Sequence, residues 1–237
     1  MKVGAIIFSR MSSRRLPSKA LIEINGRTLL GRVIDLTKLI EGVDKVVVAT
    51  STEIEDEPIR KFVENEDISL FRGNLKDVCV RALDVCNKYN FDKFVRICGD
   101  RPFFCHKIIN RLISEHNKYD VDIVTNMFPR TYPAGFTGEI ISKRALEKII
   151  SLTKNHDDRE HLTKYIYNNP SKFSIINIKY EGFEKIDNLS LTVDNNHDLI
   201  RSQWIASKID FDNKKHDNYL DKIIQLAKEW NNKKIQI

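Results

Sequence analysis

Apolar strands alternate with helical segments through the first half of this chain. Continuous apolar runs predict buried strands at Val3–Phe8, Lys45–Thr50 and Lys93–Cys98. Helical spacing of apolar residues fills the intervals at Thr28–Ile40, Glu57–Asn65 and Lys76–Asn90. Because strands that alternate with helices form parallel sheets covered on both faces, the sequence predicts a three-layer α/β fold with a mostly parallel sheet.

The second half of the chain continues this alternation less regularly. Further strands are expected at Ser69–Phe71, Val121–Thr125 and Ser174–Lys179. Further helices are expected at Pro102–Lys118, Lys143–Leu152, Arg159–Asn168, Asn196–Ala206 and Asn218–Trp230. Two prolines and two glycines within Phe128–Gly138 predict a loop and a lobe boundary. We therefore expect a single domain, residues 1–237, with a smaller lobe at about residues 128–170.

Composition excludes several classes of protein. The 237 residues, 41% hydrophobic and 30% charged, are typical of a globular domain. No apolar run is long enough for a membrane span or a secretory signal, so we expect a cytoplasmic protein. The net charge of +6 comes from Lys and Arg interspersed with Asp and Glu, which argues against a nucleic-acid partner.

Cysteine and histidine spacing gives no metal motif. The four cysteines lack paired C-x-x-C spacing and are expected to be reduced core thiols. The histidines without ligand spacing are expected at the surface or at helix ends: His106, His116, His156 and His216. The run 155–158 is expected to cap a helix.

Polar segments follow four of the predicted strands, at Ser9–Lys19, Thr50–Thr52, Arg72–Asn74 and Gly99–Asp100. In a parallel sheet these strand ends lie along one edge, which is where such sheets bind ligands. The first segment carries four cations and several serines, and Arg offers a planar set of donors that matches phosphate oxygens. A solvated basic loop is the alternative, and the absence of G-x-x-x-x-G-K-[ST] excludes a Walker-type loop.

Two carboxylates suit a metal-bound phosphate. Asp100 follows a strand and a glycine, and Asp194 follows the short apolar segment 191–193. Mg²⁺ is usually held by one or two carboxylates together with substrate phosphates. The alternative is that these residues cap helices, a role that Asp198 suits better.

These motifs together resemble a known family. Arg10, Ser13, Arg15-Leu16-Pro17 and Lys19 resemble the A-R-x-x-S-x-R-L-P-x-K signature of cytidylyltransferases, which activate sugar acids as CMP conjugates. The branch most similar is the spore-coat polysaccharide type. The chain departs from the family at Ser12 and Ser18, where a small residue or glycine is common.

Four later segments also resemble that family, in the same order. They are F-R-G-x-x-x-D-V-x-x-R at 71–81, R-x-x-G-D-x-P at 96–102, Y-P-x-G-x-x-x-E at 132–139 and T-V-D-x-x-x-D-L at 192–199. R-E-H-[VL]-T at 159–163 resembles the spore-coat branch. The resemblance implies a Rossmann-like nucleotidyltransferase that uses CTP and Mg²⁺, releases pyrophosphate and serves surface polysaccharide biosynthesis as a homodimer. The acceptor would be an anionic sugar or a phosphorylated metabolite.

The resemblance and the strand-end pattern together nominate the site residues. Those with a catalytic role would be Arg10, Lys19 and Asp100, with Asp100 and Asp194 as metal ligands. Those near the nucleotide would be Ser9, Arg10, Ser12, Ser13, Arg15, Lys19, Thr50, Arg72, Gly73, Asp77 and Gly99. Those near the acceptor would be Tyr132, Gly135, Glu139, Arg159 and His161, although the Glu160–His161 pair could be structural. Arg81 is expected to pair with Asp77 at helical i,i+4 spacing.

Two other functions stay open. A glycosyltransferase would use a D-x-D metal motif, and Asp120-Val121-Asp122 has that spelling, but it begins a predicted strand and so faces away from the ligand edge. A nucleotide-binding protein without catalysis is the other alternative, against which the retained Lys19, Asp100 and Asp194 argue.

Overall fold

A central sheet of seven strands organises the computed structural model, which describes residues 1–182, 186, 188–211 and 218–234. The strand order is β5-β4-β1-β6-β8-β7-β9. Its strands are β1 (Val3–Phe8), β4 (Lys45–Ser51), β5 (Ser69–Gly73), β6 (Lys93–Cys98), β7 (Ile123–Thr125), β8 (Glu139–Ser142) and β9 (Ile175–Asn177). Strand β8 runs antiparallel to β6 and β7, whereas the other neighbouring pairs are parallel.

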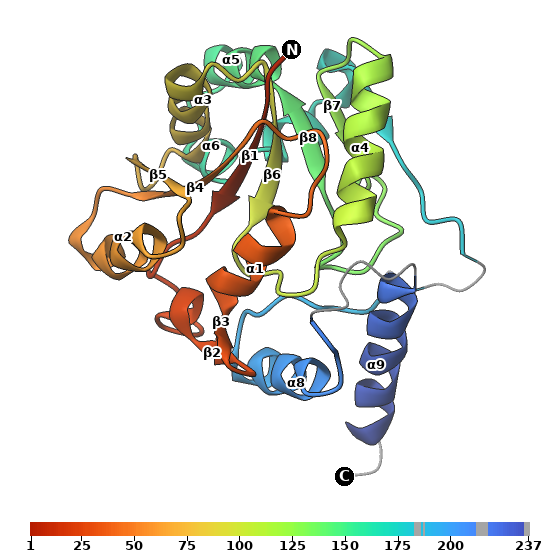
Figure 1. The fold of residues 1–237 in the computed structure, drawn as a ribbon. Helices are drawn as coiled ribbons and strands as arrows, with labels where there is room; N and C mark the ends of the chain where they lie inside the picture. Colours follow the sequence, from red (N-terminus) through yellow and green to blue (C-terminus); the bar gives the residue numbers. More distant parts are fainter. Residues whose placement is uncertain (183–185, 187, 212–217, 235–237) are drawn as a thin grey trace.

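Helices cover both faces of this sheet (Figure 1). The helices are α1 (Leu29–Thr37), α2 (Glu57–Glu64), α3 (Val78–Tyr89), α4 (His106–Lys118), α5 (Lys143–Leu152), α6 (His156–Glu160), α7 (Lys164–Asn168), α8 (Asn196–Ala206) and α9 (Tyr219–Lys234). Short 3-10 helices lie at η1 (Lys19–Leu21), η2 (Ile54–Asp56) and η3 (Pro170–Lys172). Apolar side chains of α1, α2 and α4 share one core cluster with Ala5 and Ile7, whereas those of α3, α5 and α7 share another with Ile6. The predicted three-layer α/β fold is therefore confirmed.

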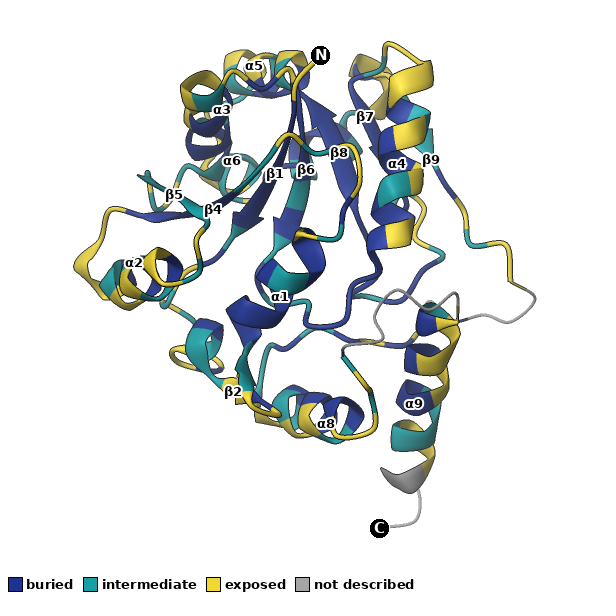
Figure 2. Cartoon of the chain, in the orientation of Figure 1, coloured by how far each residue is buried: buried dark blue, intermediate teal, exposed yellow. Residues whose placement is uncertain are grey.

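A third apolar cluster lies beyond the carboxyl ends of the strands. It joins α8, α9 and the hairpin of β2 (Glu23–Ile24) and β3 (Arg27–Thr28) to Leu16, Phe103 and Val193. Figure 1 shows α8 and α9 on the far side of those strand ends from the N-terminus, and Figure 2 shows buried residues along both helices where they face the rest of the chain. The C-terminal layer formed by α8 and α9 therefore faces the carboxyl edge of the sheet.

Most predicted elements form, and a few differ. Strands β1 and β6 and helices α5 and α8 have the predicted bounds. The helix expected from Pro102 begins at His106, and the one expected over Arg159–Asn168 is divided into α6 and α7. Strand β8 was not expected, because its four residues are too few to show a clear pattern directly after a loop rich in Pro and Gly. As a result, the segment that we expected to form a smaller lobe contributes an interior strand to the sheet.

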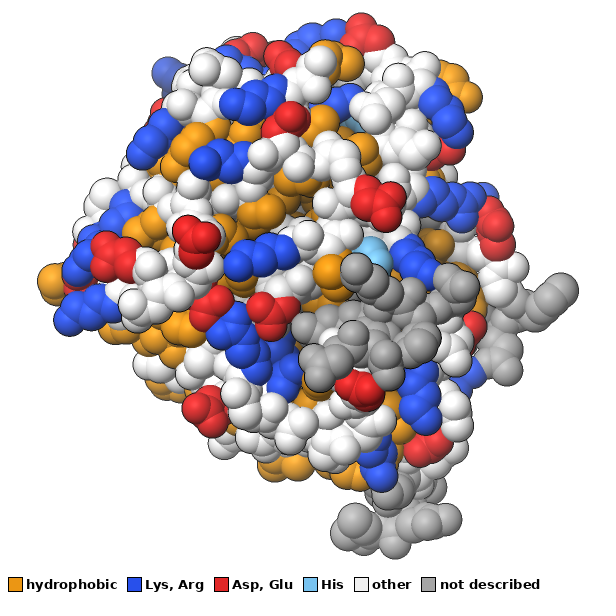
Figure 3. Space-filling view, in the orientation of Figure 1, with side chains coloured by type: hydrophobic (Ala, Val, Ile, Leu, Met, Phe, Trp, Pro, Cys, Tyr) orange, Lys and Arg blue, Asp and Glu red, His pale blue; other side chains and the backbone are white. Residues whose placement is uncertain are grey.

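Several smaller expectations can also be compared with the structure. Asn155 caps α6 by accepting hydrogen bonds from the backbone N–H groups of Asp157 and Asp158, as predicted. The four cysteines are free thiols, and Cys79, Cys86 and Cys105 are buried. Within the described ranges, no helix combines the length and the apolar character that crossing a membrane requires. Figure 3 shows acidic and basic side chains interspersed over one face of the molecule.

Two histidines are more buried than the sequence suggested. His106 and His116 lie in the first and last turns of α4, as expected for helix-end residues, but both are buried. His116 Nδ1 lies 3.4 Å from Nζ of the buried Lys93, which also donates to Asn117 Oδ1 at 2.6 Å. Burial and the charge of Lys93 lower the pKa of His116 to about 4. His216 lies outside the described residues.

We expect the folded state to lose stability as pH falls from about 6.5 toward 4. A histidine whose folded pKa is depressed binds its proton more tightly in the unfolded chain, so its contribution is complete above the unfolded pKa and disappears on acidification. The loss amounts to about 1.4 kcal/mol for each unit of pKa difference. Urea unfolding of the wild type and of His116→Asn at pH 7.5 and pH 5 measures it. Equal pH dependence of the two proteins would contradict the assignment to His116.

Candidate active site

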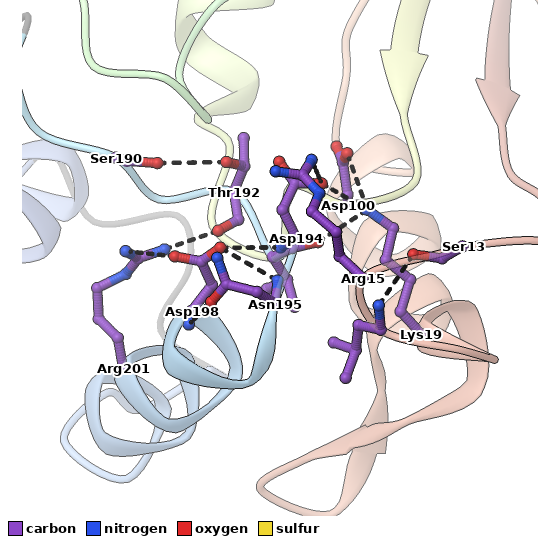
Figure 4. A network of polar contacts seen from close by, with 12 residues as sticks. Ser13, Arg15, Lys19, Asp100, Ser190, Thr192, Asp194, Asn195, Asp198 and Arg201 are labelled. Carbon is purple, nitrogen blue, oxygen red and sulfur yellow. Dashed lines mark hydrogen bonds and ion pairs between the residues drawn. The ribbon is translucent and has the colours of Figure 1, made fainter.

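The ammonium group of Lys19 joins three separate segments at the carboxyl edge of the sheet (Figure 4). Lys19 Nζ donates to the carbonyl of Val193 at 2.9 Å and to Asp194 Oδ1 at 2.9 Å, and it lies 3.4 Å from Asp100 Oδ2. Lys19 ends the basic loop (Ser9–Lys19) and begins η1, Asp100 follows β6, and Asp194 precedes α8. The structure thus brings one lysine and both nominated metal ligands to one place.

Backbone contacts fix the two aspartates beside each other. The N–H of Val193 donates to the carbonyl of Asp100 at 2.9 Å, and the N–H of Gly99 donates to the carbonyl of Phe8 at 2.9 Å. A Cβ at Gly99 would lie only 3.0 Å from the Phe8 oxygen and from the Ser9 side chain. A side chain at residue 99 would therefore require the ends of β1 and β6 to move apart by a few tenths of an ångström.

The helix-capping alternative fails for Asp194. Helix α8 is capped by Asn195, whose side chain accepts from the N–H of Asp198, while Asp198 Oδ2 accepts from the N–H groups of Asp194 and Asn195. Asp198 therefore supports the helix start, as predicted, and the carboxylate of Asp194 stays directed toward Lys19. Helix α4 has Cys105 at its N-cap, so Asp100 does not cap it either.

The charges around Asp194 favour its ionised form. Burial opposes ionisation, but the hydrogen bond from Lys19 and the charges of Lys19, Arg15 and Arg101 lower the pKa of Asp194. Arg15 Nη2 lies 3.3 Å from Asp194 Oδ1 and keeps 68% of its side chain exposed. The site therefore has an ionised carboxylate with an exposed cation beside it.

The donor set of this site suits a hard divalent cation that arrives with a phosphate. Asp100 and Asp194 offer oxygen ligands, the type that Mg²⁺ prefers. In the part of the chain that the structure describes, no group of three or more His, Cys, Asp or Glu side chains is arranged to hold a metal. Two carboxylates completed by substrate phosphates are a common arrangement for Mg²⁺.

The basic loop begins with a cation that already has a partner. Arg10 Nη2 lies 3.1 Å from Glu160 Oε1, and both side chains are more than one third exposed. This contact uses only Nη2, so the other guanidinium donors of Arg10 can still bind a phosphate. Ser18, near the end of the loop, has φ +56°, a left-handed conformation that glycine adopts at less cost.

The nominated side chains at the ends of β4 and β5 both bind the segment that ends β4 and leads into α2. Thr50 is fully buried and donates to Asp56 Oδ2 at 2.9 Å. The guanidinium of Arg72 donates to the carbonyls of Ser51 and Glu53 and to Glu57 Oε2. Nucleotide contacts by Thr50 and Arg72, and by neighbouring Gly73, remain predictions.

Asp77 and Arg159 pair with each other. Asp77 caps α3 by accepting from the N–H of Val80 at 2.9 Å, and Arg159 Nη2 donates to Asp77 Oδ2 at 2.6 Å. The expected Asp77–Arg81 pair is wrong, because Arg159 takes the carboxylate. Arg81 Nη1 instead donates to the carbonyl of Asn74 at 3.2 Å, and burial lowers the pKa of Arg81 to about 10.

The segment nominated for the acceptor contains a buried polar cluster. Glu139 is 1% exposed, and its carboxylate receives Arg96 Nη1 at 2.6 Å and the hydroxyl of Tyr167 at 2.6 Å. Arg96 and Tyr167 were not among the nominated site residues, although Arg96 is a charged residue inside an otherwise apolar strand. Tyr132 is buried in the third apolar cluster.

Two other residues nominated for the acceptor lie apart from this cluster. Gly135 has φ +106°, and a Cβ there would lie 2.8 Å from that of Leu191. His161 is 62% exposed beside Asp157. Acceptor contacts by all of the nominated residues remain predictions.

The D-x-D motif lies away from this site. Asp120 and Asp122 precede β7, at the opposite edge of the sheet from the strand carboxyl ends, and both contact Arg144. This position agrees with the sequence argument against a glycosyltransferase.

The fold and the site residues can now be compared with known proteins. A family model described as cytidylyltransferase matches residues 4–235. The chain belongs to the cytidylyltransferase family. It is therefore a nucleotidyltransferase, as its motifs suggested.

Curated relatives of this cytidylyltransferase cover most of its length. The chain is 30% identical to the uncharacterized protein MJ1063 of Methanocaldococcus jannaschii, over 95% of this chain and 93% of that protein. It is 26% identical to the spore coat polysaccharide biosynthesis protein SpsF of Bacillus subtilis, over 81% of each.

Solved structures agree with this assignment. A cytidylyltransferase from Leptospira borgpetersenii superposes with a TM-score of 0.89 at 30% identity, over 98% of this chain and 96% of the other. A CMP:2-keto-3-deoxy-manno-octonic acid synthetase complexed with CTP has the same fold, with a TM-score of 0.67 at 16% identity over 88% and 99% of the two chains.

Removing the Lys19 charge should destabilise the protein through its two aspartates. We expect Lys19→Met to lower the free energy of unfolding by about 1 kcal/mol, because two neighbouring carboxylates lose their shared cation. The double variant Lys19→Met/Asp194→Asn should lose less than the sum of the single variants. Urea unfolding of the four proteins in a double-mutant cycle measures the coupling. Additive effects would contradict the interaction.

Proposed function

We propose that this protein transfers CMP from CTP to an anionic acceptor and releases pyrophosphate. The observation that carries the proposal is the convergence of Lys19 with Asp100 and Asp194 at the carboxyl edge of the sheet, in a chain of the cytidylyltransferase family. An acceptor oxygen attacks the α-phosphorus in line, and the bond from that phosphorus to the β-phosphate oxygen breaks. Positioning and charge stabilisation suffice for such a reaction, so no protein nucleophile is needed.

The cations of the basic loop serve the triphosphate. Arg15 is exposed beside Asp194, and Lys19 lies between the two carboxylates, so both can reach phosphate oxygens at the same edge. Arg10 would join them through the guanidinium donors that Glu160 does not occupy. Charge-assisted hydrogen bonds of this kind are stronger than neutral ones and orient a phosphate well.

The two carboxylates would hold Mg²⁺. When bound, this ion would neutralise charge that develops on the phosphates during transfer. Asp100 and Asp194 would supply oxygen ligands to it, and the phosphates would complete its coordination. Lys19, which lies beside both carboxylates, would supply a further positive charge to the phosphates.

The acceptor and the biological setting extend this proposal. SpsF is named for spore coat polysaccharide biosynthesis, and other curated relatives are 3-deoxy-manno-octulosonate cytidylyltransferases. By that similarity, the acceptor is a sugar acid or a phosphorylated sugar, and the product serves surface polysaccharide assembly in the cytoplasm. A homodimer through residues 128–170 would agree with the exposed Leu152 at the end of α5.

Thermal unfolding with each nucleoside triphosphate tests the proposed nucleotide. A ligand that binds only the folded state raises the melting temperature by mass action. We expect an increase with CTP that depends on Mg²⁺ and exceeds that with UTP, GTP, ATP and dTTP. The same increase with all five nucleotides would contradict a preference for cytosine, and an increase with none would contradict the proposed function.

A pair of aspartate variants tests the proposed site. We expect Asp100→Asn to reduce pyrophosphate release at least 100-fold while some CTP binding remains, because a neutral amide is a poor metal ligand. Asp120→Asn is the matched control: it removes an exposed carboxylate of the D-x-D motif and should keep wild-type turnover. Loss of activity in the Asp120 variant alone would support the glycosyltransferase alternative. Unchanged turnover in the Asp100 variant would remove Asp100 from the mechanism.

A further inference from the structure

A buried carboxylate, Asp56, lies behind the basic loop without belonging to any motif discussed above. Asp56 is 1% exposed and ends η2, directly before α2. Its position suggests a helix cap, but its side chain makes no capping hydrogen bond to α2. The carboxylate is instead directed toward the ends of β1 and β4.

The two oxygens of Asp56 bind two different segments. Oδ1 accepts from the backbone N–H of Met11 at 2.7 Å, within the basic loop. Oδ2 accepts from the hydroxyl of Thr50 at 2.9 Å and from both the N–H and the hydroxyl of Ser51 at the end of β4. One buried carboxylate therefore connects the loop after β1 to the end of β4.

The charge of Asp56 is retained although the side chain is buried. Burial alone would raise the pKa of this carboxyl, but the hydrogen bonds from Met11, Ser51 and Thr50 lower it. Hydrogen bonds to an ionised acceptor are shorter and stronger than those between neutral groups. The connection is therefore firmer than an ordinary contact between two loops.

The basic loop closes on the backbone of Met11. Its carbonyl accepts from the N–H of Ser13 at 2.8 Å and from the N–H of Ser18 at 3.3 Å. The loop thus returns to Met11 immediately before Lys19. Because Asp56 holds the N–H of the same residue, one anchor sets the place of a loop that carries Arg10 and Arg15.

We propose that Asp56 is a positioning residue that holds the basic loop in its ligand-binding arrangement before a nucleotide arrives. The proposal rests on the proposed function, in which this loop binds the triphosphate. Asp56 is too buried to touch the nucleotide and acts through Met11. A loop ordered in advance costs less entropy on binding and so raises affinity.

The substitution Asp56→Asn changes the charge and the hydrogen-bonding pattern of the side chain while its size stays the same. A backbone N–H faces each oxygen of Asp56, that of Met11 at Oδ1 and that of Ser51 at Oδ2. An asparagine has one acceptor oxygen and one NH₂ group, so in either orientation its NH₂ faces a backbone donor. The variant keeps the volume of the side chain, removes its charge, and leaves one backbone N–H, that of Met11 or that of Ser51, without its acceptor.

Asp122 provides the matched control. It is 5% exposed, lies before β7 at the opposite edge of the sheet, and accepts from the N–H of Ser174 at 3.0 Å. Asp122→Asn therefore removes a buried charge that binds a backbone donor without involving the basic loop. Both variants should lower the melting temperature, whereas only Asp56→Asn should change nucleotide binding.

Calorimetric titration with CTP and Mg²⁺, well below the melting temperatures, gives the decisive comparison. We expect Asp56→Asn to raise the Kd for CTP about tenfold and Asp122→Asn to stay within twofold of the wild type. In steady-state turnover, Asp56→Asn should raise the KM for CTP by a similar factor, with a smaller change in kcat. Wild-type affinity in a folded Asp56→Asn protein would overturn the inference and leave the proposed function intact. No binding of CTP by the wild type would overturn the proposed function itself.

Hydrogen exchange in the wild type tests the anchor without any substitution. We expect the amide of Met11 to exchange slowly in the free protein and to change little when CTP is added, because its hydrogen bond to Asp56 already exists. Fast exchange in the free protein, with protection only after CTP binds, would overturn the inference. This measurement decides the question if the Asp56 variant does not fold.

Discussion

The candidate site depends on the ion pairs that the ammonium group of Lys19 makes. Its two carboxylate partners, Asp100 and Asp194, lie 81 and 175 residues further along the chain. Two carboxylates brought to one place repel each other, and the lysine between them offsets that repulsion. The hydrogen bond from Val193 to Asp100 then fixes the segment before α8 against the end of β6, and the buried side chain of Val193 joins it to the C-terminal layer.

The carboxyl edge of the sheet contains two kinds of charged side chain. Asp56 and Glu139 are buried and bind donors of the protein: Asp56 holds the loop at Met11, and Glu139 joins β8 to β6 and α7. Arg10 and Arg15 keep 43% and 68% of their side chains exposed and have weakly held partners. Under the proposed function, the exposed cations would contact the nucleotide and the buried acids would keep the surrounding structure in place.

Sequence predicted the parts of this structure that have local signals. Strands β1 and β6 are long apolar runs, and their bounds were predicted from that pattern. Strand β8 has four residues and takes its place through pairing with β6 and β7, which no local pattern reveals. Lys19, Asp100 and Asp194 were nominated by motifs and do lie together. Asp56 was missed because its partner is a backbone N–H 45 residues away, and every residue type except proline supplies such a donor.

The order of these residues along the chain has a consequence for biosynthesis. Domains form as the N-terminal portions of a chain emerge from the ribosome. The basic loop and Asp100 emerge first, whereas Asp194 follows only after the last strand of the sheet, β9. A nascent or prematurely terminated chain that ends before Asp194 therefore has cations for a phosphate but lacks the second carboxylate beside Lys19. The proposed site is therefore complete only after the chain beyond Asp194 has been synthesised and α8 and α9 have packed against Leu16 and Phe103.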